Sequence, residues 1–198
     1  MLRSLVLLGL GSLLFWGCST NVASYEKENR GVYLLFSPTK ERLAKMDVIK
    51  DMFTYIINDM SPGDTLVVDS AGYDPLRIEL SKNPELAYKQ KRAFRSSLDL
   101  FLKQLKPTKT CQIDNALARA KEYLSKKAIK HRSILLCSDA KVLKRRVREL
   151  DGMTVSLLNF IDEKKLDLQK LVQKIEGANG KLIVAAQLSD LDKALSYR

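Results

Sequence analysis

The chain has 198 residues, with 34 Lys and Arg against 23 Asp and Glu, one His and three Cys. This length suits one domain with an ordinary apolar core, because a domain of about 150 residues already hides roughly two thirds of the surface that its unfolded chain exposes. Nine Gly, five Pro and three Cys exclude collagen-like and disulfide-scaffold proteins. The formal net charge of +11 suggests an acidic partner: nucleic acid, an anionic membrane surface or an acidic protein face.

The first 20 residues have the pattern of a secretory signal. A basic start at Arg3 precedes an apolar run from Leu5 to Trp16. This run has about a dozen residues, fewer than the roughly 20 that a membrane-spanning helix needs. Residues 14–18, Leu-Phe-Trp-Gly-Cys, resemble a bacterial lipobox, in which a small residue precedes the cysteine that is lipidated. The alternatives are an ordinary signal peptide or an uncleaved anchor, with Cys18 uninvolved.

The lipobox resemblance implies a bacterial lipoprotein with three segments. Residues 1–17 would be the signal peptide, residues 18–30 a tether acylated at Cys18 by palmitate-like chains, and residues 31–198 the folded domain. Ser19 rather than Asp after the cysteine resembles the signal for the outer membrane, so we expect the domain to face the periplasm. Cleavage removes Arg3 alone among charged residues and leaves 33 basic and 23 acidic residues, a formal +10.

Predicted strands and helices alternate along the body of the chain. Apolar runs rich in β-branched residues predict strands at residues 31–36, 65–69, 76–80, 133–137, 153–160 and 181–186. Apolar spacings of three and four predict helices at residues 40–60, 83–105, 113–124, 141–150, 168–175 and 189–196. Asn83 and Ser189 are the expected N-caps of two of these helices. Such alternation indicates an α/β fold: a three-layer, Rossmann-like domain with a mainly parallel sheet and helices on both faces.

Several segments resemble the von Willebrand factor type A domain family. Residues 36–40, Phe-Ser-Pro-Thr-Lys, stand where the family has its metal-binding Asp-x-Ser-x-Ser, and residues 61–64 resemble its Pro-Gly-Asp turn. Residues 111–117, Cys-Gln-Ile-Asp-Asn-Ala-Leu, are similar to its Thr-Asn-Ile-x-x-Ala-Leu, and residues 133–140 to its strand ending in Thr-Asp-Gly. The resemblance implies a type A-like fold over residues 31–198.

The resemblance also locates a metal site, and this chain departs from it. Phe36 replaces the first Asp and Cys111 the Thr of the second loop, so Asp139 alone is retained. Ser37 and Thr39 are alternative hydroxyl ligands. Because Mg²⁺ requires several oxygen ligands, the interpretation is a vestigial metal cleft at Ser37, Thr39 and Asp139, with no metal and no other cofactor. Retained Mg²⁺ is the alternative.

Two cysteines remain once Cys18 is assigned to the lipid. The resemblance brings Cys111 and Cys137 to the same cleft, which implies either a disulfide or two buried thiols. His131 is interpreted as a surface residue at the start of a strand. The chain has no nucleophile elbow, no phosphate-binding loop and no zinc spacing. We therefore expect no enzymatic activity and no small-molecule substrate.

Basic side chains recur at helical spacing between residues 141 and 148. Lys141, Lys144, Arg145 and Arg148 share one helix face, which is either a solvated surface or a docking face. A lipid-anchored envelope protein rarely meets nucleic acid, so the expected partners are the membrane and acidic surfaces of other envelope proteins.

The sequence thus predicts a non-catalytic lipoprotein that acts as an interaction or scaffold component of a cell-envelope complex. The alternatives are a Mg²⁺-dependent ligand-binding domain and an envelope enzyme with an unrecognised site.

Overall fold

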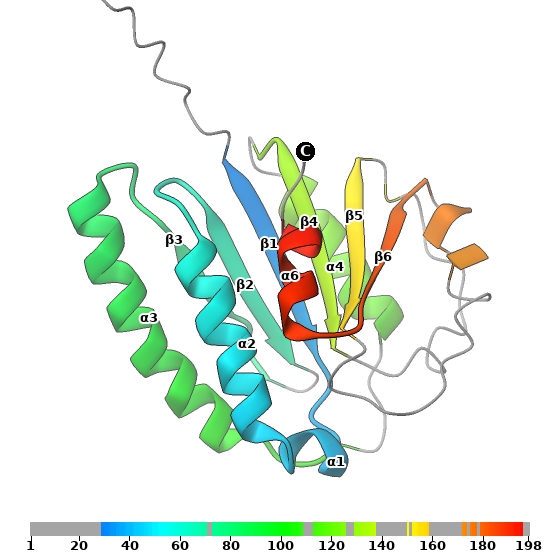
Figure 1. Ribbon diagram of the computed structural model, residues 1–198, viewed down its shortest axis with the longest axis horizontal. Helices are drawn as coiled ribbons and strands as arrows, with labels where there is room; N and C mark the ends of the chain where they lie inside the picture. The colour runs from blue at the N-terminus through cyan, green and yellow to red at the C-terminus, as the bar shows by residue number, and fades with distance from the viewer. Residues whose placement is uncertain are drawn as a thin grey trace, which may run out of the picture.

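The computed structural model describes residues 29–70, 73–108, 113–125, 129–137, 150, 152–158, 172–173, 175–177 and 179–195. Figure 1 shows a twisted central sheet with helices in front of it and behind it. The sheet has six strands in the order β3-β2-β1-β4-β5-β6. The strands are β1 (Arg30–Phe36), β2 (Thr65–Ser70), β3 (Leu76–Glu79), β4 (His131–Cys137), β5 (Met153–Leu158) and β6 (Lys181–Ala185).

The sheet confirms the predicted fold class. Among the described residues, β1, β2, β4, β5 and β6 run parallel, and β3 pairs antiparallel with β2 at the edge of the sheet. On the central strand β1, Leu34 pairs with Val68 on one side and with Leu135 on the other. All three are buried, as expected for central parallel strands that are covered on both faces. The first strand begins at Arg30, one residue before the predicted start of the domain.

The helices are α1 (Lys40–Leu43), α2 (Met46–Asp59), α3 (Pro84–Gln104), α4 (Ile113–Ser125), the 3₁₀ turn η3 (Leu188–Asp190) and α6 (Leu191–Leu195). The single helix predicted at residues 40–60 is wrong, because the chain leaves the helical path between Leu43 and Met46. The apolar spacing continues across this break and so could not reveal it. The short first helix is tied to the end of β1 by Arg42, whereas α2 packs against the sheet.

One predicted N-cap is confirmed and the other is wrong. The Asn83 side chain accepts hydrogen bonds from the backbone N–H groups of Glu85, at 3.0 Å, and Leu86, at 3.1 Å. Ser189 lies inside the 3₁₀ turn η3, whose N-cap is Gln187, and the Asp190 carboxylate accepts hydrogen bonds from the N–H groups of Ala186 and Gln187.

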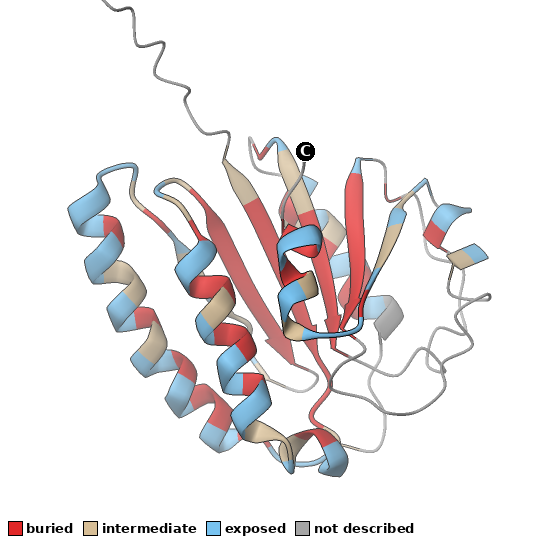
Figure 2. Cartoon of the chain, in the orientation of Figure 1, coloured by how far each residue is buried: buried red, intermediate tan, exposed pale blue. Residues whose placement is uncertain are grey.

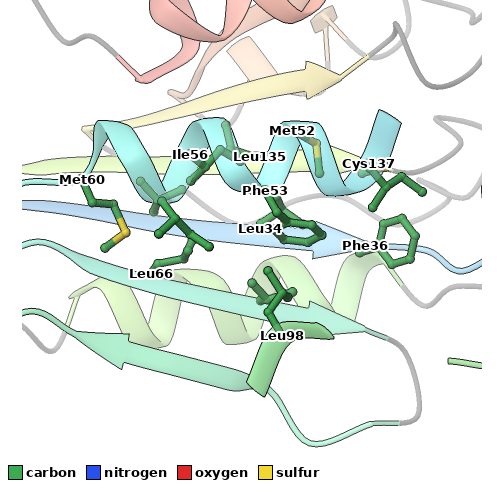
Figure 3. Packing of buried hydrophobic residues seen from close by; sticks show 14 of the residues in the cluster. Leu34, Phe36, Met52, Phe53, Ile56, Met60, Leu66, Leu98, Leu135 and Cys137 are labelled. Carbon is green, nitrogen blue, oxygen red and sulfur yellow. The ribbon is translucent and has the colours of Figure 1, made fainter. Parts of the chain in front are cut away.

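Two apolar clusters lie on opposite faces of the sheet. The larger one joins α2, α3 and α6 to the alternate strand residues that include Leu34 and Leu66. The smaller one joins α4 to the intervening residues, which include Leu35 and Val67. The buried stripes of the helices face the sheet in Figure 2, and Figure 3 shows the packing of the larger cluster. The domain is therefore a three-layer structure, and its core alternates along each strand.

An ion-pair junction closes the amino end of β1. The Arg30 guanidinium donates to the Asp64 carboxylate from Nη2 at 2.9 Å and from Nε at 3.1 Å, and to the Asp59 carboxylate at 2.7 Å. It also reaches the carbonyl oxygen of Leu195 at 3.4 Å. Asp64 is buried and accepts a further bond from the Ser61 N–H at 2.8 Å. Arg30 thus links β1 to the end of α2, to the turn before β2 and to the last helix.

We predict that Arg30→Met lowers the free energy of unfolding by about 3 kcal/mol, because it leaves the buried Asp64 carboxylate without its cationic partner. Urea unfolding followed by circular dichroism measures this. Arg92→Met, which changes an exposed arginine of α3, is the matched control and should cost less than about 0.5 kcal/mol. Equal effects of the two substitutions would contradict the role of the junction.

Candidate functional site

The carboxyl edge of the sheet is the expected place for a ligand site. β1 lies between β2 and β4, and the chain passes from β1 to β2 on one side before it returns to β4 on the other. In open α/β sheets, ligands bind beyond the carboxyl ends of the strands at such a switch in strand order. Here β1 ends at Phe36 and β4 ends at Cys137, and the two residues are paired in register.

The predicted cleft residues Ser37 and Thr39 lie at this edge, and both take part in bonds within the chain. The Ser37 N–H donates to the carbonyl oxygen of Cys137 at 3.0 Å, and its own carbonyl oxygen accepts from the Thr39 N–H at 2.8 Å. The Thr39 hydroxyl caps α1 by accepting from the Arg42 N–H at 3.3 Å. The third predicted cleft residue, Asp139, lies outside the described residues.

A buried arginine, which sequence reasoning missed, stands beside Ser37. The Arg42 side chain belongs to a residue that is 1% exposed, and its Nη1 donates to the Ser37 carbonyl oxygen at 3.0 Å. A signal existed in the sequence: Arg42 lies four residues before Met46, and Met46 lies three residues before Ile49. Those spacings place it on the apolar side of the helical stripe rather than on the solvent side.

The described residues at this edge supply few oxygen ligands for a divalent cation. Phe36, at the position of the family's first Asp, is buried in the larger apolar cluster. The Thr39 hydroxyl is used as a helix cap, and the nearby Arg42 guanidinium is a buried positive charge. In the part of the chain that the structure describes, no group of three or more His, Cys, Asp or Glu is placed to hold a metal ion. Mg²⁺ requires several oxygen ligands, usually with one carboxylate among them.

A second polar group lies at the end of β2, on the face covered by α4. One oxygen of Asp69, Oδ2, accepts from the Tyr33 hydroxyl at 2.8 Å and from Nη2 and Nε of Arg119 at 2.9 and 3.1 Å. Asp69 is 1% exposed, whereas half of the Arg119 side chain is exposed. The other oxygen, Oδ1, is buried without a hydrogen-bond partner, and so is the Oγ of Ser70.

Aromatic side chains extend this group across the α4 face. The rings of Tyr33 and Tyr123 meet edge to face at 6.1 Å between centroids, and the Arg77 guanidinium carbon lies 5.3 Å from the centroid of Tyr123. Burial, the hydrogen bond to Asp69 and the charge of Asp69 raise the pKa of Tyr33, against the smaller opposing effect of Arg119. Tyr33 therefore keeps its proton at neutral pH and acts as a hydrogen-bond donor.

Most of the other predicted site residues lie outside the described residues. These are Cys18, Cys111, Lys141, Lys144, Arg145 and Arg148. Cys137 is fully buried and lies beside Phe36 at one end of the larger apolar cluster (Figure 3). The Cys111–Cys137 disulfide stays a prediction. His131 is partly exposed and is the first residue of β4, where the sequence predicted it.

The helices that the structure describes include none that is both long enough and apolar enough to cross a membrane.

Comparison with solved structures identifies the fold. The chain resembles a mutant of the PilB minor pilin from Streptococcus sanguinis, with a TM-score of 0.54 and 12% identity over 86% of this chain and 60% of that one. It resembles the ArnB paralog VWA2 from Sulfolobus acidocaldarius, with a TM-score of 0.51 and 14% identity over 85% of this chain and 44% of that one. It also resembles the manganese-loaded TRAP protein of Plasmodium vivax, with a TM-score of 0.50 and 14% identity over 85% of this chain and 72% of that one.

These neighbours show a von Willebrand factor type A-like fold, as the resemblance in the sequence implied. The chain spans less than two thirds of the length of the first two. No protein-family model matches the sequence, and the search of curated proteins gives no match either.

We predict that the contribution of the Tyr33 hydroxyl to stability falls in alkaline solution. A tyrosine whose pKa is raised by folding stabilises the folded state below its unfolded pKa of about 10 and loses that contribution as the pH rises further. Tyr33→Phe should lower the free energy of unfolding by about 1–2 kcal/mol at pH 8. By pH 11 the gap between wild type and variant should narrow by about 1 kcal/mol.

Urea unfolding at the two pH values measures this gap. Tyr88→Phe is the control, since Tyr88 is well exposed on α3. A gap between wild type and Tyr33→Phe that is the same at pH 8 and pH 11 would contradict the assignment.

Proposed function

We propose that the chain is a non-catalytic envelope lipoprotein whose type A-like domain binds other proteins and acts as an interaction or scaffold component of a cell-envelope complex. The type A-like fold is typical of protein-interaction and ligand-binding domains. The observation that carries the proposal is the carboxyl edge of the sheet, where the described residues Ser37, Thr39 and Arg42 are bonded to one another.

The two ends of β1 indicate how the domain would be oriented relative to the membrane. A tether acylated at Cys18 would enter the domain at Arg30, the first residue of β1, at the amino edge of the sheet. Ser37 follows the last residue of the same strand, about 20 Å away at the rise of a parallel strand. A domain held at the membrane through this tether would therefore present the edge that carries Ser37 away from the lipid.

The alternatives have less support from the described residues. A Mg²⁺-dependent binding site would have to form beside the buried Arg42 guanidinium. An enzyme would need a nucleophile paired with a base. The described polar group of Tyr33, Asp69 and Arg119 contains no such pair. Tyr33 keeps its proton at neutral pH, and the Asp69 carboxylate is paired with Arg119.

The positive charge supports an acidic protein partner. On α3, Lys91 and Arg95 bond to α2 through the Asn58 carbonyl and the Asn58 side chain. Burial lowers the pKa of Lys91. Lys89 and Arg92 on the same helix are exposed. Part of the formal charge thus serves packing, and exposed side chains such as Lys89 and Arg92 are available for electrostatic docking.

We predict that the two edges of the sheet give different products in site-specific photo-crosslinking on intact envelopes. A crosslinking residue in place of Lys40, which is exposed in α1 beside Ser37, should capture a protein partner, and the capture should be equal in chelator and in Mg²⁺. The matched position is Lys181, which is exposed at the start of β6 on the amino edge and should capture far less protein. Mass spectrometry of the products identifies the partner.

Capture at Lys40 that disappears in chelator would establish the metal-dependent alternative and refute the proposal. Equal capture at the two positions would refute the direction assigned to the domain. A Cys18→Ser variant tests the anchor separately: it should leave the membrane fraction, and its retention there would contradict lipidation.

A further inference from the structure

We infer that two copies of the chain form a weak dimer through the outer face of α3, with the two α3 helices packed antiparallel about a two-fold axis. The basis is the distribution of apolar and charged side chains along this helix. The dimer goes beyond the proposed function and needs neither a lipid anchor nor another protein, so either can fail without the other.

Exposed apolar side chains are concentrated on α3. Of the five large hydrophobic side chains that the described residues expose, three lie on this helix: Leu86 at 49%, Tyr88 at 64% and Leu100 at 61%. The helix packs on the domain through another side, on which Phe94 and Leu98 are buried. Figure 1 shows α3 beside α2, at the β3 end of the sheet, and Figure 2 shows the exposed outer side of the helix.

Three apolar residues, Leu86, Ala93 and Leu100, form a row along this outer face. They are seven residues apart, which is close to two helical turns, so they lie nearly in line. At 1.5 Å per residue the two leucines are about 21 Å apart, with Ala93 midway. Ala93 is exposed, and its small side chain allows a second helix to approach closely. A two-fold axis at Ala93 therefore places Leu86 of one copy against Leu100 of the other.

The charged side chains beside the row fit the same arrangement. In the antiparallel pair, Glu85 of one copy lies near Lys103 of the other. Lys89 of one copy likewise lies near Asp99 of the other. All four side chains are exposed, and both pairs are displaced by the same amount, about 3 Å along the helix, from the register of the leucines. Two-fold symmetry repeats each pair, so opposite charges flank the row on both halves.

A parallel pair of helices does not fit these side chains. It would place Glu85 opposite Glu85 of the second copy and Lys89 opposite Lys89. Like charges in such positions are unfavourable, so the charges select the antiparallel arrangement. Self-complementarity of this kind is what a two-fold interface requires, and a surface for an unrelated protein does not require it.

One helix face from each copy gives a small interface. Specific, stable complexes bury at least about 1,200 Å² in total, and smaller contacts are weak. We expect a Kd on the order of 10–100 µM, so that the chain is monomeric at low micromolar concentration and dimeric at several hundred micromolar.

Sedimentation velocity of the chain from Ser19 to Arg198 measures this association, at about 0.15 M salt to screen the net charge. Both apolar clusters consist of residues between Val32 and Leu195, so this chain keeps every described core contact. Leu100→Ser should raise the Kd at least fivefold. Tyr88→Ser is the matched control, since Tyr88 is equally exposed on the same helix but lies outside the row, and its Kd should equal that of the wild type.

Charge reversal tests the register. Glu85→Lys and Lys103→Glu should each raise the Kd at least threefold, because each places like charges together. The double variant exchanges the charges within the same pair, so its Kd should return to within about twofold of the wild type. Circular dichroism checks that each variant keeps its helix content.

Disulfide trapping tests the position of the axis. Ala93→Cys should give linked dimers on mild oxidation, because each cysteine meets its own copy there and a disulfide requires Cα atoms within about 7 Å. Leu86→Cys and Tyr88→Cys, which lie away from the axis, should link no more than the wild-type chain does.

Four results would overturn the inference. They are a wild-type chain that stays monomeric at several hundred micromolar, equal effects of Leu100→Ser and Tyr88→Ser, a double charge reversal that associates no better than the single ones, and trapping of Ala93→Cys at the level of Tyr88→Cys. Efficient linkage of Leu86→Cys to itself would show a parallel pair and would contradict the arrangement as well.

Discussion

The hydrogen bond from the Arg42 guanidinium to the Ser37 carbonyl organises the carboxyl edge of this domain. Backbone hydrogen bonds of Ser37 and Pro38 connect the same segment with the end of β4 and with the loop after α3. A fold of this kind places its ligand-binding loops at the same edge.

Arg30, the first residue of β1, and Arg42, in the helix that follows the strand, have different roles. Arg30 pairs with Asp64 and Asp59 and closes the amino edge, where the chain enters the domain. Arg42 pairs with a backbone carbonyl and closes the carboxyl edge. The Arg30 contacts join segments about 30 residues apart in the sequence, whereas the Arg42 contact joins α1 to Ser37, five residues earlier in the chain. The apolar residues between them provide the core.

The layers of the fold could be predicted from the sequence, whereas the chemistry of the edge could not. Continuous apolar runs are a strong signal for buried parallel strands, and they placed β1, β2 and β4 correctly. The break after Leu43 and the cap at Gln187 are accompanied by local side-chain hydrogen bonds, from Arg42 to Ser37 and to Asp190 from Ala186 and Gln187, which leave no trace in the apolar spacing. Arg42 is not at an oxygen-ligand position of the family motif, so the motif did not indicate it. Its spacing to Met46 and Ile49 is nevertheless that of a buried helix residue.

Titration of Mn²⁺ into the chain from Ser19 to Arg198, followed by electron paramagnetic resonance, tests the central claim most directly. The signal of free Mn²⁺ should fall no further with this protein present than with a protein of equal charge that has no metal site, up to millimolar concentrations. A loss of signal that saturates at one ion per chain with micromolar affinity would show that the edge holds a metal despite Arg42, and would contradict the account.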